Sequence, residues 1–427
     1  MDESIFFSHL ETYLDEKNIS ELKKALAEEQ TFSSIIIDEE KISREEILHL
    51  YPTLKPHPIV KNAFLFNKKE LDLGKSLLFE IGAFYIFEPC SSLVSYFLSP
   101  QEDDIILDLA AAPGGKCIHT SFLMHNKGQI IANEISSSRA EILSSNVEKY
   151  GRKNITVISS DSKQLLFLFK EYFSKIILDA PCSGSGMFRK ESKMKDDWTL
   201  EKVLSLSKTQ KELILDAYNM LKKGGELIYS TCSFSYQEDE EVIEYLLANT
   251  DAELVEIPHF EGEFRSSLKE SVHLLPHLFI GEGHFICKIK KPGILEKASR
   301  FEKSKLKIDL PLSGQFYVSG KQDVYLTNHL LPLKNLRILR NGIKIGYYDK
   351  KIGWIYDHAL SRFNDNFLPK IELTKEEATQ YIYGLSIFKD IANGYVVLTY
   401  LNIPFALGKV NNHQIKNHYP KGLRKKL

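Results

Sequence analysis

The 427-residue chain has five cysteines, an odd number, and no two of them form a CxxC pair. Neither a disulfide framework nor a metal cluster is indicated, and reduced thiols are expected. The longest apolar runs, such as residues 165–169, fall far short of the ~20 residues that span a membrane. The first residues are acidic and lack the basic and apolar stretches of a signal peptide. These absences predict a cytoplasmic protein without a metal or a membrane partner.

A strong excess of one charge is also absent, because the formal net charge is only −2. The charge is nevertheless uneven. Residues 1–50 hold thirteen acidic against five basic side chains, whereas residues 288–307 hold eight basic against two acidic ones, and residues 421–426 add four more basic ones. Solvated surface is the commoner explanation of such segments. A phosphate-binding face becomes the better interpretation if the catalytic residues point to nucleic acid.

Apolar strands and helices alternate regularly from residue 105 onward. This pattern predicts an α/β domain with a Rossmann-like, doubly wound parallel sheet over residues 75–291, with residues 284–291 as its edge strand. A small α+β accessory domain is expected over residues 1–74 and a basic linker over residues 292–308. Short strands and turns dominate residues 309–427, which predicts a β-rich module.

The first strand of the expected sheet leads into the segment DLAAAPGGK (108–116). Its small side chains would let a ligand approach the backbone, and the following helix would offer amide donors to a carboxylate. A tight turn without a ligand is the alternative. The segment lacks the GxGxxG fingerprint of dinucleotide-binding folds, so hydride transfer is disfavoured.

Acidic residues stand at the ends of three successive strands, namely Asp108, Glu134 and Asp161. A carboxylate after the second strand suits ribose hydroxyls, and one after the third suits an exocyclic amine. Each acid alone is more often a helix cap. The three together favour a nucleoside cofactor, and the missing dinucleotide fingerprint makes S-adenosylmethionine the best candidate.

Cys182 and Cys232 lie in polar turns after two further apolar strands, and Asp179 shortly precedes the first of them. A thiol can add to carbon-6 of cytosine and so make carbon-5 nucleophilic towards an electrophilic methyl group. Asp179 would hold or protonate ring nitrogen-3 if it keeps or shares a proton. Two unrelated buried thiols are the alternative.

The loop at 186–198 mixes basic residues with Phe188 and Trp198, close to the expected active thiol. Aromatic side chains stack on exposed RNA bases. An RNA-contacting loop is therefore preferred over an ordinary long connection.

Three segments, DLAAAPGGK, DAPCSGSGMFRK and YSTCSFSYQEDEE, closely resemble motifs of the Nop/Sun (NSUN) RNA 5-methylcytosine methyltransferases. The resemblance is strong over residues 75–291. Residues 339–360 and 407–424 resemble the C-terminal region of the bacterial RsmF (YebU) type, which includes a PUA-like RNA-binding domain. That branch modifies 16S rRNA. The resemblance thus implies a monomeric RNA (cytosine-5)-methyltransferase whose partner is 16S rRNA or the small ribosomal subunit.

The resemblance also implies a role for each site residue. Cys232 would be the nucleophile, Cys182 would assist release of the methylated product, and Asp179 would face both cofactor and target base. The turn would hold the methionine portion of S-adenosylmethionine, Glu134 the ribose and Asp161 the adenine edge. The implied cofactor-binding residues are Ala110, Ala111, Ala112, Pro113, Gly114, Gly115, Lys116, Glu134, Asp161 and Asp179.

Two departures from the family pattern bear on RNA positioning or the cofactor turn rather than on the chemistry. Ala110 stands where many relatives carry cysteine, and Phe87 stands where glutamine is common. The catalytic motifs do not name the RNA, so a tRNA cytosine-5 methyltransferase is an alternative. A non-catalytic RNA-binding assembly factor is a second one, although it would need neither both thiols nor the three carboxylates.

Overall fold

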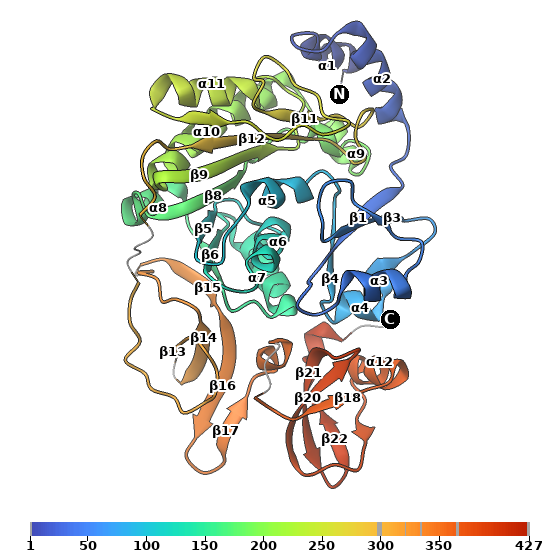
Figure 1. Ribbon diagram of the computed structural model, residues 1–427, viewed down its shortest axis with the longest axis vertical. Coiled ribbons are helices and arrows are strands. Elements are labelled where there is room, and N and C mark those ends of the chain that lie inside the picture. Colours follow the sequence, from blue (N-terminus) through green and yellow to red (C-terminus); the bar gives the residue numbers. More distant parts are fainter. Residues whose placement is uncertain (1, 297–300, 321, 334, 364–366, 425–427) are drawn as a thin grey trace.

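The computed structural model of the protein describes residues 2–296, 301–320, 322–333, 335–363 and 367–424. In Figure 1 a central α/β body lies between the N-terminal helices at the top and two β-rich parts at the bottom, with the N-terminal sheet at its side. None of the helices in these ranges is both long and apolar enough to cross a lipid bilayer.

A mixed β-sheet forms the centre of the molecule. Over the described residues, eight strands lie in the order β10-β12-β9-β8-β5-β6-β7-β15, and β11 pairs with β12. Neighbours among β5 to β9 run parallel, whereas β12 and β15 are antiparallel to β9 and β7. The strands are β5 (Ile105–Asp108), β6 (Gln129–Asn133), β7 (Ile155–Ser159), β8 (Phe173–Asp179), β9 (Leu221–Thr231), β10 (Glu253–Val255), β11 (Val272–Leu274), β12 (His284–Lys290) and β15 (Arg337–Asn341).

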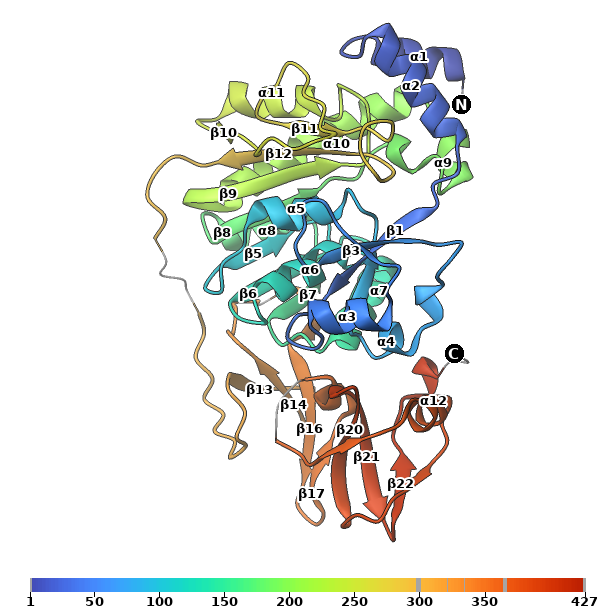
Figure 2. The ribbon, with the colours of Figure 1, turned by 45° about the vertical axis from the view of Figure 1, so that its right-hand side comes forward.

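Helices cover both faces of this sheet (Figures 1 and 2). Consecutive strand residues such as Ile106 and Leu107 enter two different apolar clusters, because adjacent side chains of a strand point to opposite faces. The predicted Rossmann-like α/β fold is confirmed. One cluster includes α5 (Ser92–Leu98), α6 (Gly115–Leu123) and α7 (Ser137–Tyr150), and the other includes α8 (Ser162–Phe169), α10 (Leu200–Met220) and α11 (Glu240–Asn249).

The prediction that residues 284–291 form an edge strand is wrong. β12 lies inside the sheet, because β10 pairs with its outer side. A three-residue strand such as β10 carries too short an apolar pattern to be recognised from the sequence.

The N-terminal part contains four α-helices among the described residues and a separate four-stranded sheet in the order β2-β3-β1-β4. β4 pairs with β1, although it follows residue 74, where the expected N-terminal domain ends. The domain boundaries stay predictions. The elements are α1 (Glu3–Leu10), α2 (Glu16–Ala27), β1 (Phe32–Ile37), α3 (Arg44–Leu50), β2 (Lys55–Pro56), β3 (Ala63–Asn67), α4 (Leu77–Glu80) and β4 (Phe84–Phe87).

The C-terminal part forms two sheets, β13-β14-β16-β17 and β18-β20-β21-β22-β19. Its strand β15 instead extends the central sheet, so this region is tied into the α/β body. The predicted β-rich character is confirmed. The elements are β13 (Gln315–Ser319), β14 (Asp323–Thr327), β16 (Ile343–Asp349), β17 (Gly353–Tyr356), β18 (Lys370–Glu372), α12 (Lys375–Tyr383), β19 (Ile387–Phe388), β20 (Gly394–Tyr400), β21 (Ile403–Asn411) and β22 (Gln414–Asn417).

Candidate active site

The ends of the parallel strands carry the acidic and sulfur-bearing residues that the sequence singles out. Asp108 is the last residue of β5, Asp179 is the last residue of β8, and Glu134 directly follows β6. Cys232 directly follows β9. Because β6, β5, β8 and β9 are neighbours, these residues lie along one edge of the sheet, where open α/β sheets bind their ligands.

The two cysteines that the sequence predicts to be catalytic lie next to each other in the structure. The sulfur atoms of Cys182 and Cys232 are 3.1 Å apart, and both residues are free, partly exposed thiols. The hydrogen bond with Cys232, and then burial, raise the pKa of Cys182 well above its usual value. Cys182 thus keeps its proton, and its thiol can donate a hydrogen bond to the sulfur of Cys232. A sulfur that accepts such a bond is a candidate nucleophile.

A buried carboxylate that sequence reasoning missed, Glu238, connects the two cysteine turns. It accepts hydrogen bonds from the N–H (2.8 Å) and hydroxyl (2.5 Å) of Ser183 and from the hydroxyl of Ser233 (2.6 Å). Gln210 of α10 donates to it as well (3.0 Å). Since each serine directly follows one of the cysteines, Glu238 holds both sulfur atoms in place. Its only signal in the sequence is an acidic run, which equally marks the start of a helix.

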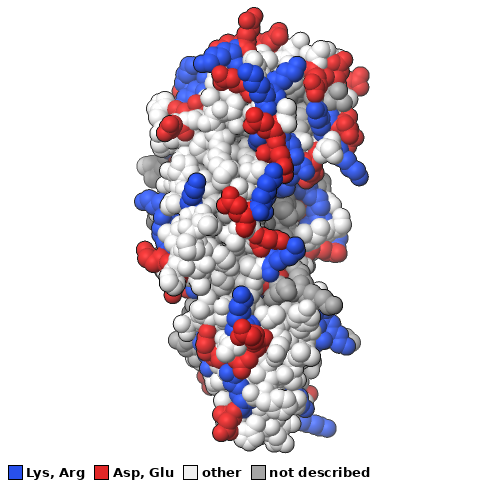
Figure 3. Space-filling view, turned by 90° about the vertical axis from the view of Figure 1, so that its right-hand side faces the viewer, with Lys and Arg blue, Asp and Glu red and all other residues white. Residues whose placement is uncertain are grey.

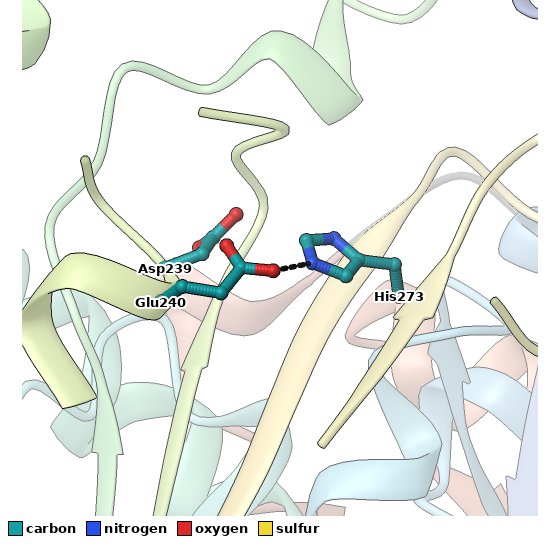
Figure 4. Close-up of side chains that lie close together, drawn as sticks. All are labelled: Asp239, Glu240 and His273. Carbon is teal, nitrogen blue, oxygen red and sulfur yellow. Dashed lines mark hydrogen bonds and ion pairs between the residues drawn. The ribbon is translucent and has the colours of Figure 1, made fainter. Parts of the chain in front are cut away.

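The next two acidic residues, Asp239 and Glu240, lie together with His273 of β11 (Figure 4). Asp239 accepts from the hydroxyl of Thr231 (2.5 Å), and Glu240 pairs with Nε2 of His273 (2.7 Å). Burial and then Glu240 raise the pKa of Asp239 well above its usual value. The three offer ligand-type atoms within 4.8 Å of one another, and Oδ2 of Asp239, Oε2 of Glu240 and Nδ1 of His273 have no hydrogen-bond partner among the described residues. The absence of a metal stays a prediction.

Asp179 is held as a carboxylate. Its Oδ2 accepts from Nζ of Lys116 (2.7 Å), and its Oδ1 accepts from the hydroxyl of Ser230 (2.8 Å) and lies 3.5 Å from Nε2 of His284. Burial favours the protonated form, but Lys116 and His284 together lower the pKa of Asp179 below its usual range. Asp179 therefore does not keep a proton of its own, because Lys116 pairs with it directly, and that it shares one with the target base stays a prediction.

The turn between β5 and α6 needs both of its glycines. Gly114 has a φ of 116°, and a Cβ on Gly115 would lie 2.0 Å from the ring of Phe87. The N–H of Ala111 is tied to the carbonyl of Asn133 (2.7 Å). The close packing and the start of α6 fit an anionic group near the backbone, such as the carboxylate of S-adenosylmethionine. The remaining turn residues Ala110, Ala112 and Pro113 are partly or fully exposed.

Glu134 suits a ribose diol. It is buried, and its Oε1 accepts from the N–H of Ser136 (2.9 Å). Its Oε2 has no hydrogen bond among the described residues and lies 3.3 Å from Arg139. The following residue, Ile135, is 70% exposed and offers an apolar surface to a flat ring, a feature that sequence reasoning missed. An apolar residue after a strand-end acid was the available signal.

The other two strand-end acids have different surroundings. Asp161 is exposed and caps α8, accepting from the N–H of Gln164 (2.9 Å), so it does serve as a helix cap. Asp108 is fully buried, and neither carboxyl oxygen has a hydrogen bond among the described residues. Burial raises the pKa of Asp108 to about 8, although the charge of Lys116 opposes this. Asp108 is thus a carboxyl that holds its proton at neutral pH.

The expectation that Phe188 and Trp198 contact RNA is wrong. Trp198 is only 2% exposed, and both rings pack against Phe6 of α1, with centroid distances of 5.4 Å and 5.0 Å. Arg189 of the same loop is paired with Glu282 (3.0 Å). The loop at 186–198 therefore anchors the N-terminal helices beside the cysteine turns.

Comparisons with known proteins identify relatives of the chain. Residues 95–290 match the family described as 16S rRNA methyltransferase RsmB/F, and residues 368–425 match the methyltransferase RsmF PUA domain. Ribosomal RNA small subunit methyltransferase F of Vibrio parahaemolyticus is 32% identical over 412 residues, which cover 87% of this chain and 86% of that protein. The Aliivibrio fischeri (strain MJ11) protein of the same name is 30% identical, with 87% and 85% covered.

Solved structures share the fold of the catalytic part. A methyltransferase homologue protein from Pyrococcus horikoshii is 28% identical with a TM-score of 0.59, covering 67% of this chain and 94% of that chain. NSun6 from Pyrococcus horikoshii, solved with SFG, is 24% identical with a TM-score of 0.61, covering 67% and 98%.

Proposed function

The chain belongs to the family of ribosomal RNA small subunit methyltransferase F and uses S-adenosylmethionine, and from this premise we propose that it methylates carbon-5 of a cytosine in 16S rRNA. The observation that carries the proposal is the 3.1 Å separation of the Cys182 and Cys232 sulfur atoms, at the sheet edge that also holds Asp179. Carbon-5 of cytosine is a poor nucleophile and needs a thiol adduct at carbon-6, whereas methylation of a nitrogen or oxygen needs none.

In this mechanism the Cys232 thiolate adds to carbon-6 of the cytosine. The Cys182 thiol stabilises that thiolate by its hydrogen bond. Bound S-adenosylmethionine supplies an electrophilic methyl group. Once carbon-5 carries the methyl group, its proton passes to solvent with the aid of Cys182, the ring double bond re-forms and Cys232 is expelled as a thiolate.

The cofactor-binding roles rest on the surroundings of each residue. We assign residues 110–116 to the methionine portion, because their turn is shaped by glycine and starts a helix. Glu134 keeps an oxygen available for the ribose hydroxyls, and Asp161 is exposed towards solvent for the adenine edge. As a carboxylate, Asp179 can accept a hydrogen bond from the exocyclic amino group of the target base.

The RNA partner is proposed from the relatives and from the C-terminal region. The curated relatives are named for small-subunit rRNA, which supports 16S rRNA over tRNA. We assign RNA binding to residues 309–427, of which residues 368–425 match a PUA domain. Acidic and basic side chains are interspersed on the face in Figure 3, so charge alone would not direct RNA there. The proposed reaction takes place in the cytoplasm on a monomeric enzyme.

Bisulfite sequencing of 16S rRNA and tRNA from a strain that lacks the gene tests the proposal. We expect 16S rRNA to lose 5-methylcytosine, and the wild-type gene but not Cys232→Ala to restore it. A loss confined to tRNA would establish the tRNA alternative. Unchanged methylation in every RNA, combined with a ribosome assembly defect, would establish the non-catalytic alternative.

A further inference from the structure

His284 is a buried histidine at this site that the mechanism above does not use. It is the first residue of β12 and is 3% exposed. The next residue, Phe285, pairs with Thr231 at the end of β9, so His284 lies beside the turn that contains Cys232. Neither ring nitrogen has a hydrogen bond of good geometry among the described residues. A buried polar group without a partner is costly, which calls for a role.

The imidazole of His284 faces Asp179. Its Nε2 lies 3.5 Å from Oδ1, at the limit of hydrogen bonding, whereas Lys116 occupies Oδ2 at 2.7 Å. The side chain of Asp179 is 31% exposed. Asp179 can therefore contact a substrate, whereas the neighbouring His284 is buried.

The proposed reaction requires a proton donor for the target base beside Asp179. As the sulfur of Cys232 bonds to carbon-6, an electron pair moves through the ring to nitrogen-3, which then requires a proton. Asp179 has none to give, because it is ionised. The ammonium group of Lys116 is already paired with Asp179. Histidine is the side chain whose ordinary pKa suits proton exchange near neutral pH.

Resting on the proposed cytosine chemistry, we propose that His284 is a positioning residue that stores the proton which Asp179 passes to nitrogen-3. The imidazolium gives its Nε2 proton to Asp179, and Asp179 gives a proton to nitrogen-3 as the sulfur–carbon bond forms. After methyl transfer the carbon-5 proton passes to solvent with the aid of Cys182, its electron pair re-forms the ring double bond, and Cys232 departs as a thiolate. Nitrogen-3 then returns its proton through Asp179 to His284, so this pair ends the cycle unchanged.

Other ionisable groups around this end of β12 already have partners or stay neutral. Glu88 accepts from the N–H of Glu282 (2.8 Å), and Glu282 pairs with Arg189 (3.0 Å). Burial raises the pKa of Cys90 well above its usual value, so its thiol stays neutral. The same edge of the sheet carries two further pairs of ionisable side chains, Asp179 with Lys116 and Cys182 with Cys232.

Single-turnover release of tritium from 16S rRNA labelled at carbon-5 of cytosine tests this role across a pH series. His284→Gln keeps a hydrogen-bond donor but cannot exchange a proton, and His284→Phe removes both properties. We expect the rate of either variant to fall on the order of a hundredfold, with unchanged affinity for S-adenosylmethionine and RNA. The rate of the variants should also lose the dependence on pH that the wild-type rate shows. His259→Gln, at an exposed histidine outside the proposed site, should behave as wild type.

A His284→Gln variant with the wild-type rate would overturn the proposal, because holding Asp179 in place would then suffice. So would a variant that retains the pH dependence of the wild-type rate. If His284→Phe does not fold, as judged by cofactor binding, His284→Gln decides alone. Wild-type enzyme that releases no tritium would refute the cytosine-5 function itself, whereas tritium release that is independent of His284 would refute only this role.

Discussion

Cys182 and Cys232 owe their different proposed roles to their surroundings. Their local sequence alone predicts two thiols in strand-end turns, because an apolar run followed by a polar turn is a local signal. The link through Ser183, Glu238 and Ser233 could not be predicted from the sequence. These hydrogen bonds form because β8 and β9 are neighbours in the folded sheet and Glu238, just before α11, lies between the turns that follow them.

The Glu238 carboxylate can be tested with Glu238→Gln. The amide would place an N–H group among the Ser183 and Ser233 donors and would break at least one hydrogen bond. We expect the free energy of unfolding to fall by about 1–3 kcal/mol and the methyl-transfer rate to fall, with cofactor affinity unchanged. Glu241→Gln, three residues later in α11, where the side chain is partly exposed and paired with Lys211, is the matched control. Wild-type rate and stability in Glu238→Gln would contradict the role of Glu238.

The raised pKa of Asp108 makes stability depend on pH. Between about pH 4, where an unfolded aspartate ionises, and about pH 8, the folded chain keeps a proton that the unfolded chain has lost. The Asp108 contribution to the free energy of unfolding is thus largest at low pH and is lost as the pH rises through this window. In calorimetry, the Tm of Asp108→Asn relative to wild type should rise from about pH 5 to about pH 8. A constant difference would show that Asp108 is ionised throughout.

At the level of whole elements, the parallel strands and the helices between them follow from the sequence, since each carries its own apolar pattern. The placements of α1 and β15 do not. α1 packs through Phe6 on Phe188 and Trp198, and β15 pairs with β7, so both positions depend on partners that are far away in the chain. Because α1 is far from the loop at 186–198 in the sequence, its packing on the aromatic residues of that loop could not be predicted. The sequence alone therefore predicts those residues as RNA contacts.

The turn before α6 is tested by Gly115→Ala. The new Cβ would collide with the Phe87 ring, at 2.0 Å, and push the turn away from the proposed methionine site. We expect calorimetry to show roughly tenfold weaker binding of S-adenosylmethionine, equivalent to about 1.4 kcal/mol. Phe87→Ala added to Gly115→Ala should restore part of the affinity. Gly422→Ala, where a Cβ meets nothing within 4 Å, is the control. Unchanged affinity in Gly115→Ala would place the cofactor elsewhere.

At the scale of the whole molecule, the C-terminal region is not a detachable appendage. β15 belongs to the central sheet, and the side chain of Arg362 donates to the hydroxyl of Tyr419 (2.9 Å) and the carbonyl of Glu80 (3.2 Å). One apolar cluster joins the N-terminal sheet to the last sheet of the chain. A cut at residue 309 would therefore remove a strand from the α/β body, which the sequence could not indicate.

Deletion of residues 368–427 keeps β15 and tests RNA binding by the last sheet. We expect lower thermal stability, unchanged affinity for S-adenosylmethionine and weaker binding of 16S rRNA. The slope of the logarithm of RNA affinity against the logarithm of salt concentration should become shallower. The expected change is about 0.7 for each phosphate of single-stranded RNA that the shortened protein no longer neutralises. Filter binding at several salt concentrations measures both quantities. The same affinity and slope as wild type would show that this sheet does not bind RNA.

The covalent adduct between Cys232 and cytosine is the central claim, and Cys182→Ala tests it most directly. Without Cys182 the carbon-5 proton should leave slowly, so the enzyme should accumulate bonded to 16S rRNA in the presence of S-adenosylmethionine. A denaturing gel should show a slow band, and mass spectrometry should place the nucleotide on Cys232. The band should vanish in the Cys182/Cys232 double variant. An adduct that forms instead in Cys232→Ala, with the nucleotide on Cys182, would contradict the assignment of Cys232 as the nucleophile.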